Sequence, residues 1–339
     1  MKERKIQLTG GSTYTVSLPK EWATEMGLET GDPLRLYPQD RRLIIEPSRQ
    51  NEEARETTVA VGGYSERKVR RMVLAFYTSG YNTITVTAAD GLGGNRRAIA
   101  TTARNLIGLE IIESGERRMK LKNLLDSTSV SAAQSTAQIQ QVTLSMHEDA
   151  ITALLKQDPS LAEHVVKRDD QVDRLYAMVS RQFQRSLKHL GNAAELEDGR
   201  MKLYDYQTTA RQFERVADHA VKITDLTTRF DEPVPAEFAH RIKRIADRSR
   251  TILTQAATPL IDDGETELAH DALDRRNEVL AEISEVEQDL HSQEIEASHL
   301  IALTLDSLTR TAEYGGNIAE HSLNATARGE QLSGGYQGH

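Results

Sequence analysis

The sequence predicts a multi-domain protein: a short N-terminal β domain and a small α/β unit precede an all-α part made of two three-helix bundles. Three observations predict this layout. Short strand patterns separated by turn residues fill residues 1–48, strand and helix patterns alternate over 58–113, and helical periodicity runs from about residue 121 to 329. A chain of 339 residues is long enough for two or three domains, each with its own core.

The domain boundaries that we expect are 1–48 for the β domain, 58–120 for the α/β unit and 121–329 for the helical part. The two bundles of the helical part should lie at about 121–230 and 235–329. In the β domain, the segments Lys5–Leu8 and Tyr14–Leu18 alternate with period two, and Pro19 opens a short helix. Two further strands are expected at 34–37 and 43–46.

The β domain has too few apolar residues to bury a core alone, so we expect it to form a homodimer. The residues expected in the shared core are Val16, Leu18, Trp22, Leu34, Leu36, Ile44 and Ile45. In the α/β unit, strands are expected at 58–61, 83–87 and 109–112, with helices at 65–77 and 95–107 between them.

Six helices are expected in the last part of the chain, near 129–156, 160–190, 195–229, 235–261, 265–291 and 294–327. A tetrad appears on the third and again on the sixth helix, as Arg211-x-x-Glu214-x-x-x-Asp218 and Arg310-x-x-Glu313-x-x-x-Asn317. Three helices followed by three more, with one motif at matching places, indicate an internal duplication.

The tetrad spacing projects its members from one face of a helix. Glu214 and Asp218 repel one another when both are ionised, unless a cation lies between them. Together with Asp169 and Asp173 on the preceding helix they could form an oxygen-rich site of the kind that hard or borderline cations prefer. The alternative is a solvated acidic stripe in which the two tetrad arginines pair with the carboxylates. His219 and His321, next to the tetrads, are expected to be surface histidines.

Composition narrows the possible classes of protein. The chain has no Cys, which excludes disulfides, thiolate metal sites and cysteine nucleophiles. No apolar run approaches the roughly 20 residues of a membrane-spanning helix, so we expect a cytoplasmic protein. Residues 1–120 carry 19 basic and 15 acidic side chains, whereas residues 121–339 carry 23 and 36. Only the N-terminal part is therefore suited to approach a polyanion.

The N-terminal segment resembles the AbrB/SpoVT-type (MazE-like) swapped-hairpin domains. Residues 11–21, GSTYTVSLPKE, followed by Gly27-Leu28 and Gly31-Asp32, match the pattern of that family. The resemblance implies two interleaved chains and contacts with double-stranded DNA. The candidate DNA-binding residues are Lys2, Arg4, Lys5, Lys20, Arg35, Arg41 and Arg42. The alternative is a solubilising surface, because nearby acidic residues offset nearly all of this charge.

The helical part resembles PhoU, a phosphate-signalling protein built from two three-helix bundles. The segments that carry the resemblance are VVKRDDQVD at 165–173 and FERVADHA at 213–220. It implies carboxylate-held metal ions and the restraint of phosphate uptake when phosphate is plentiful. The metal ligands that we expect are Asp169, Asp173, Glu214, Asp218, Glu313 and Asn317. The metal would be a divalent or trivalent ion, with iron, manganese, magnesium and zinc as candidates.

The second bundle departs from the family pattern, because Asn317 stands where the first bundle has Asp218 and Tyr314-Gly315-Gly316 replaces the usual residues before it. A second metal site is therefore in doubt.

The sequence carries no recognised catalytic signature, so we expect a regulator rather than an enzyme. It would be a phosphate-responsive, DNA-binding homodimer, with a phosphate ABC transporter or a sensor kinase as a possible partner. Two alternatives stay open. In one, the hairpin domain only dimerises and the bundles dock on a phosphate transporter. In the other, the protein is a carboxylate-cluster metalloprotein. The latter is disfavoured because no Glu-x-x-His pairing repeats, as a di-iron bundle would require.

Overall fold

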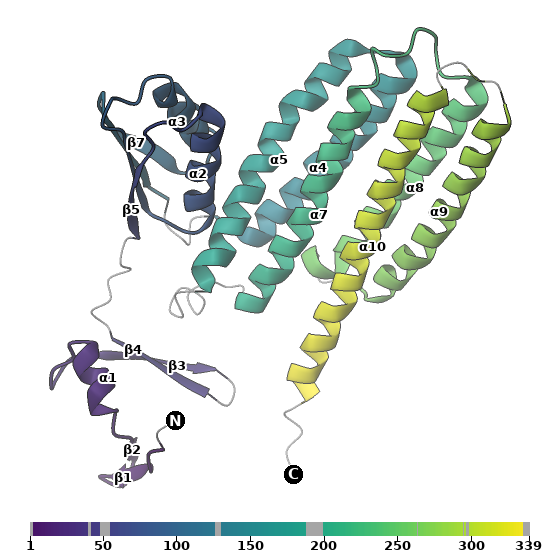
Figure 1. Ribbon diagram of the computed structural model, residues 1–339. Helices are drawn as coiled ribbons and strands as arrows, with labels where there is room; N and C mark the ends of the chain where they lie inside the picture. The colour runs from purple at the N-terminus through teal and green to yellow at the C-terminus, as the bar shows by residue number, and fades with distance from the viewer. Residues whose placement is uncertain are drawn as a thin grey trace. The chain divides into compact units, whose positions relative to one another are not determined.

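The computed structural model describes residues 3–39, 42–47, 55–125, 130–187, 199–262, 264–293, 295 and 298–334. The chain forms two compact units, Met1–Ala54 and Arg55–His339, and each is described by itself (Figure 1). The multi-domain layout expected from the sequence is confirmed: a β-rich N-terminal segment is followed by an α/β unit and a long helical part.

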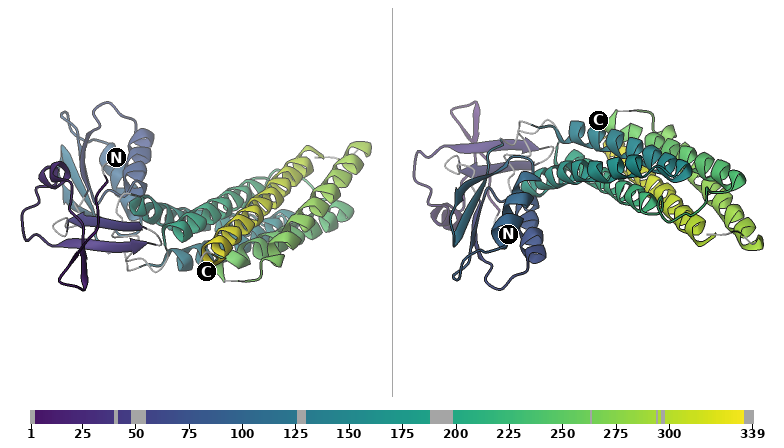
Figure 2. Two further views of the ribbon diagram at one scale, coloured as in Figure 1. Left: turned by 90° about the horizontal axis from the view of Figure 1, so that it is seen from below. Right: turned by 90° about the horizontal axis from the view of Figure 1, so that it is seen from above.

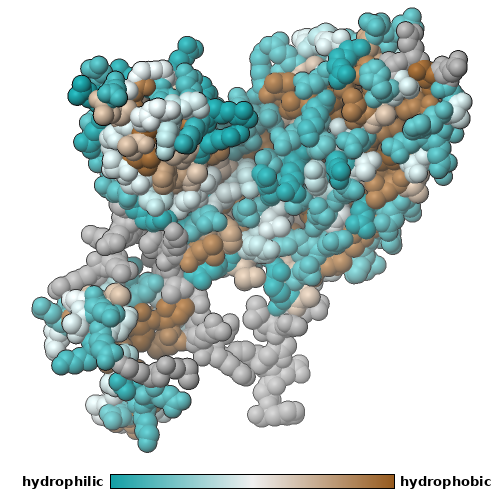
Figure 3. Space-filling model, viewed as in Figure 1, coloured by the Kyte–Doolittle hydropathy of each residue, from teal (hydrophilic) through white to brown (hydrophobic). Residues whose placement is uncertain are grey.

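The N-terminal unit contains two separate antiparallel hairpins. Strands β1 (Gln7–Thr9) and β2 (Thr13–Thr15) pair with one another, as do β3 (Leu34–Gln39) and β4 (Arg42–Pro47), and helix α1 (Lys20–Glu25) lies between the hairpins in sequence. None of the residues described in this unit is buried. Several of its apolar side chains are exposed, for example Leu8 at 60%, Tyr14 at 77% and Leu36 at 56%, whereas Trp22 and Ile44 are half-buried. Figure 3 shows an apolar patch on the surface of this unit.

The α/β unit has a four-stranded sheet with two helices. Its elements are β5 (Glu56–Ala60), α2 (Glu66–Thr78), β6 (Thr83–Thr87), α3 (Asn95–Arg104), β7 (Leu109–Ser114) and β8 (Arg118–Asn123). The strand order is β5-β6-β8-β7, with β5 parallel to β6 and with β8 antiparallel to both of its neighbours. Val69, Val73 and Tyr77 of α2 pack on Ile84 and other buried side chains of the sheet.

Strand β8 was not predicted, although it lies inside the sheet between β6 and β7. Its sequence alternates, with Met119 and Leu121 buried in the core while Arg118 and Lys122 are exposed. Three basic residues in a run of six give the segment a polar composition that hides the two-residue period. The expected α/β alternation therefore ends in an antiparallel hairpin.

The helical part contains all six expected helices: α4 (Ala132–Lys156), α5 (Pro159–Ser186), α7 (Arg200–Thr224), α8 (Ala236–Ile261), α9 (Glu267–Ser292) and α10 (Ser298–Gly334). Local capping explains where they begin and end. Gln157 adopts a left-handed φ of 50° and ends α4, and the carboxylate of Asp158 accepts hydrogen bonds from the backbone of Ser160 and Leu161 at the start of α5.

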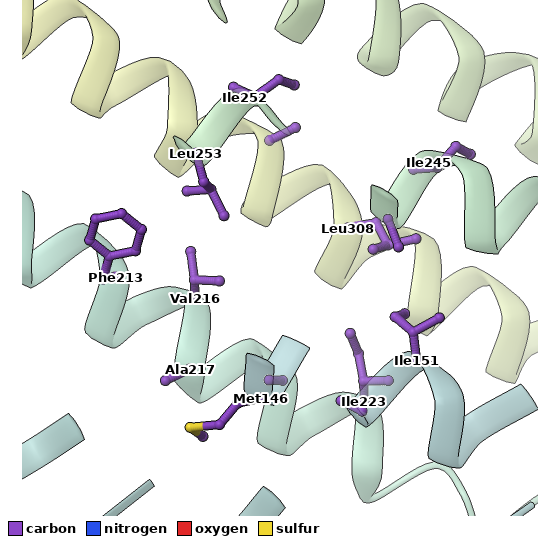
Figure 4. Packing of buried hydrophobic residues seen from close by; sticks show 14 of the residues in the cluster. Met146, Ile151, Phe213, Val216, Ala217, Ile223, Ile245, Ile252, Leu253 and Leu308 are labelled. Atoms are coloured by element: carbon purple, nitrogen blue, oxygen red, sulfur yellow. The ribbon is translucent and has the colours of Figure 1, made fainter. Parts of the chain in front are cut away.

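Helices α4, α5 and α7 form the first bundle, and α8, α9 and α10 form the second. The two bundles lie lengthwise against each other, chiefly through α7 and α10, as the views in Figure 2 show. Their buried side chains make one continuous apolar core. Figure 4 shows Phe213 and Val216 of α7 pointing toward Leu253 of α8, so the bundles share a core and do not stack as separate domains.

The α/β unit is attached to the first bundle through α2 and α5 (Figure 1). Ala177 of α5 belongs to the core of the α/β unit. The guanidinium of Arg181, which is 4% exposed, donates hydrogen bonds of 2.7 Å to the carbonyl oxygens of both Tyr77 and Tyr81. Among the described residues, no helix is both long and apolar enough to cross a membrane.

Candidate functional site

Both tetrads make the same internal ion pair. Arg211 lies 2.9 Å from a carboxylate oxygen of Glu214, and Arg310 lies 2.8 Å from one of Glu313. The pairing of each tetrad arginine with its neighbouring carboxylate, which the sequence left open as an alternative, is therefore present in both bundles. The pair in the first bundle is the less exposed of the two, because the Glu214 side chain is 14% exposed and that of Glu313 is 40% exposed.

The first bundle places four carboxylates within electrostatic reach of one another, Asp169 and Asp173 on α5 with Glu214 and Asp218 on α7. Burial raises the pKa of Asp169 to about 6, and the charges of Asp173 and Asp218 act in the same direction. Burial raises the pKa of Asp173 as well, with Asp218 adding to the effect. Burial also raises the pKa of Glu214 to about 7, although Arg211 opposes this rise. The negative charges of these four carboxylates are therefore not fully offset by the nearby arginine.

The chemistry of these donors fits a hard cation, because all four are carboxylates and burial, with the neighbouring carboxylates, raises the pKa values of Asp169, Asp173 and Glu214. One oxygen of Glu214, Oε2, is buried and has no hydrogen-bond partner among the described residues. The side chains do not, however, converge as they stand. Nowhere in the described part of the chain do three His, Asp or Glu side chains form a group that could hold a metal ion. Asp218 is exposed, so a change of rotamer is open to its side chain.

The second tetrad has different surroundings. The amide of Asn317 donates a hydrogen bond of 3.3 Å to Gln212 of α7, so this side chain lies at the junction between the bundles. From α9, Arg276 lies beside Gly316, where an added Cβ would meet its Cδ at 2.5 Å, and it forms an ion pair of 3.3 Å with Glu320. An arginine of α9 thus approaches the second tetrad. In the first bundle, carboxylates of α5 lie opposite the first tetrad instead.

The glycines of the second tetrad have a packing role that the sequence did not reveal. A Cβ on Gly315 would lie 2.6 Å from a methyl carbon of Ile252, so the glycine lets α10 approach α8 closely. Gly316 likewise lets the side chain of Arg276 approach α10 closely. The departure from the family pattern at these positions is therefore explained by helix packing.

The prediction that His219 and His321 are surface histidines is wrong, since they are only 7% and 9% exposed. The ring of His219 lies 5.8 Å from that of Tyr314 in α10, and burial lowers its pKa to about 4. The Nε2 atom of His321 lies 3.0 Å from the buried carboxylate of Asp205, which Arg328 also contacts. Both histidines stabilise the α7–α10 junction, and periodicity alone could not place them there.

Of the seven candidate DNA-binding residues, Arg4, Lys5, Lys20 and Arg35 are exposed. Arg35 lies opposite Glu46 in the register of β3 and β4. Lys2 and Arg41 lie outside the described residues, and for Arg42 only its backbone position in β4 is described.

Comparisons with known proteins agree with this architecture. Residues 136–227 match the family model of the PhoU domain, and residues 7–53 match that of the antidote-toxin recognition protein MazE, a bacterial antitoxin. No curated protein matches the sequence.

Two solved structures are similar. PhoU from Pseudomonas aeruginosa is 19% identical with a TM-score of 0.50, and the match covers 57% of this chain and 93% of that one. The phosphate transport system regulatory protein PhoU from Streptococcus pneumoniae is 17% identical with a TM-score of 0.46, over 57% of this chain and 91% of that one. The first of these likenesses concerns the fold. The helical part therefore shares its fold with that structure, residues 136–227 are similar to the PhoU domain, and residues 7–53 are similar to MazE.

Proposed function

We propose that this protein is a phosphate-responsive transcriptional regulator. In this proposal the N-terminal unit dimerises and binds double-stranded DNA, and the PhoU domain responds to phosphate status. The observation that carries the proposal is the combination of a MazE-type domain with a PhoU domain in one chain. A regulatory function also agrees with the sequence, in which we recognise no catalytic signature.

Dimerisation is supported by the exposure of the N-terminal unit. None of its described residues is buried, although it carries Leu8, Tyr14, Val16 and Leu36. A unit of this size reaches a stable core only by burying such side chains against a partner. A second copy of the same unit is the partner that the MazE-type match suggests.

DNA binding is supported by charge, since Arg4, Lys5, Lys20 and Arg35 are exposed while the net negative charge lies after residue 120. Basic side chains that contact phosphates release counterions, so affinity should fall as salt rises. We would measure the binding of the full chain to promoter DNA of phosphate-transport genes by fluorescence anisotropy. The double variant Arg41→Ala with Arg42→Ala should lower the log–log salt slope by about one to two. An unchanged slope would exclude these two residues from the DNA contact.

We further propose that the carboxylate cluster of the first bundle holds a divalent or trivalent cation, with Asp169, Asp173, Glu214 and Asp218 as ligands. Such an ion would neutralise four carboxylates and link α5 to α7. Elemental analysis of the purified protein, after growth with iron, manganese, magnesium and zinc, tests this proposal. The double variant Glu214→Ala with Asp218→Ala should lose the metal and keep its helicity by circular dichroism.

The second tetrad provides a matched control. The double variant Glu313→Ala with Asn317→Ala removes the corresponding groups from α10, where Arg276 approaches. We expect it to retain the metal content of the parent protein. If both double variants lose metal to the same extent, the second tetrad also binds an ion. If the parent protein contains no metal, the cluster has a structural role only.

Two other functions remain as alternatives. If the full chain binds no promoter fragment even at low salt, the hairpin domain serves to dimerise the protein, and docking of the bundles on a phosphate transporter becomes the better account. If metal is present and supports turnover of a substrate, the protein is a carboxylate-cluster metalloenzyme.

A further inference from the structure

A cleft of about 500 Å³ separates the α/β unit from the first bundle. One wall comes from α2 and α3, with Arg70, Arg71 and Thr101 among its residues. The other comes from α5 and α7, with Arg174 and Tyr176. Cavities of about 300 to 1,000 Å³ hold organic molecules of cofactor size, so this one is larger than an inorganic ion requires.

The walls of the cleft are held in place by buried contacts. Arg181 of α5 donates two hydrogen bonds to backbone oxygens next to the C-terminal end of α2, and Ala177 on the same helix face packs into the core of the α/β unit. Next to them, Arg185 lies so close to Gly80 that an added Cβ would meet its Cγ at 2.7 Å. The spacing of α2 and α5 is therefore fixed by packing, and the cleft is a built part of the fold.

Four arginines line the cleft, and they differ in what they contact. Arg211 is engaged by Glu214 at 2.9 Å and lies 5.4 Å from the ring centre of Tyr176. Arg70 has an ion pair of 3.6 Å with Glu66. Arg71 and Arg174 make no hydrogen bond or ion pair with any residue that the structure describes. Two unpaired guanidinium groups on facing walls favour an anion with several oxygens, such as a phosphate group.

The other residues that line the cleft favour a ligand that is larger than a phosphate ion. Leu74, Leu106 and Ala177 give the cleft an apolar part on which a flat ring could pack. Asp170 lies on the α5 wall and can accept hydrogen bonds from amino or hydroxyl groups, and Asp173 and Glu214, two of the proposed metal ligands, line the cleft as well. They would repel a free inorganic anion. A molecule with a phosphate at one end and hydrogen-bond donors at the other could satisfy both walls.

We propose that this cleft binds a nucleoside phosphate. The phosphate would lie between Arg71 and Arg174, the base on the apolar part of the lining, and the hydroxyl or amino groups toward the carboxylates of α5. The proposal goes beyond the regulatory function proposed above and does not depend on a bound metal. The cleft lies between the α/β unit and the helix that carries Asp169 and Asp173. A bound nucleotide would therefore be a second signal, besides phosphate, to which the regulator responds.

Isothermal titration calorimetry of the full chain with ATP, ADP, AMP and inorganic phosphate tests the proposal. At least one nucleotide should bind, and inorganic phosphate should bind at least tenfold more weakly. The double variant Arg71→Gln with Arg174→Gln should weaken nucleotide binding about 10- to 100-fold, since each substitution removes a charge-assisted hydrogen bond. The matched control is Arg67→Gln with Arg104→Gln, which removes two exposed arginines of α2 and α3 outside the cleft and should leave the affinity unchanged.

A second variant, Thr101→Trp, fills the cleft without changing its charge and should also abolish nucleotide binding. The proposal is wrong if no nucleotide binds, if inorganic phosphate binds as tightly as every nucleotide, or if the control weakens binding as much as the cleft variant. Retained binding in Thr101→Trp would place the nucleotide elsewhere and overturn it as well.

Discussion

His147 provides a direct test of how the core between the bundles responds to acid. Its ring is fully buried in α4, Nδ1 lies 3.3 Å from a guanidinium nitrogen of Arg250 in α8, and Nε2 has no partner among the described residues. Burial lowers the pKa of His147 to about 3, and the charges of Arg250 and His219 act in the same direction. The folded protein therefore holds this imidazole neutral at any pH above about 4.

The direction of the pH effect follows from the difference between the pKa of His147 in the folded protein and its pKa in the unfolded chain. In the unfolded chain His147 binds a proton below about pH 6.5, whereas in the folded protein it does not until about pH 3. Its contribution to the free energy of unfolding is therefore complete above pH 6.5 and is lost progressively as the pH falls toward 3. Between pH 7 and pH 4 the loss amounts to about 3 kcal/mol.

Urea denaturation followed by circular dichroism at pH 7 and pH 4 measures this loss. We expect the variant His147→Gln to lose about 3 kcal/mol less than the parent protein between the two pH values. Asp169 and Glu214, whose raised pKa values act in the opposite direction, are common to both proteins and cancel in the comparison. The control His164→Gln changes an exposed histidine and should behave like the parent. An identical pH dependence in His147→Gln and the parent would show that the buried imidazole of His147 does not cause this loss of stability in acid.

Three further predictions concern the packing of the units. Arg181→Met leaves the backbone oxygen of Tyr81 without a donor among the described residues, at a cost of about 1–3 kcal/mol, while the oxygen of Tyr77 keeps the amide of Gly80; the variant should speed hydrogen exchange in the α/β unit while α8–α10 keep their protection. Gly315→Ala pushes a methyl group against Ile252 and should lower the free energy of unfolding by about 1–2 kcal/mol, after the gain in helix propensity, and an unchanged urea midpoint would contradict the close approach of α10 to α8. A fragment of residues 1–54 should sediment as a dimer, and a folded monomer would show that its exposed apolar side chains need no partner.

The helices could be predicted from the sequence because their apolar spacing and their breakers are local signals. Asp158 and Pro159, for example, define the start of α5 through a cap and a fixed φ. The pairing of Arg211 with Glu214 could be predicted for the same reason, since the spacing along one helix determines it.

What the sequence did not reveal depends on contacts between distant segments. Met119 and Leu121 alternate in β8 among basic residues, and only the neighbouring strands β6 and β7 make that segment a strand inside the sheet. The burial of His321 follows from the packing of α10 on α7, where it meets Asp205. The cleft between α2 and α5 is likewise built by elements far apart in the chain, so neither its arginines nor its volume has a local signature.

We propose that the protein binds DNA and that it does so through its N-terminal unit. The most direct test compares the full chain with the fragment of residues 1–54 on promoter DNA by fluorescence anisotropy, from about 50 to 200 mM salt. We expect the fragment to bind as tightly as the full chain or more tightly, because the removed residues 55–339 carry 34 basic and 42 acidic side chains, and both affinities should fall with salt. Failure of the fragment to bind at the lowest salt, while it remains a folded dimer, would contradict the claim.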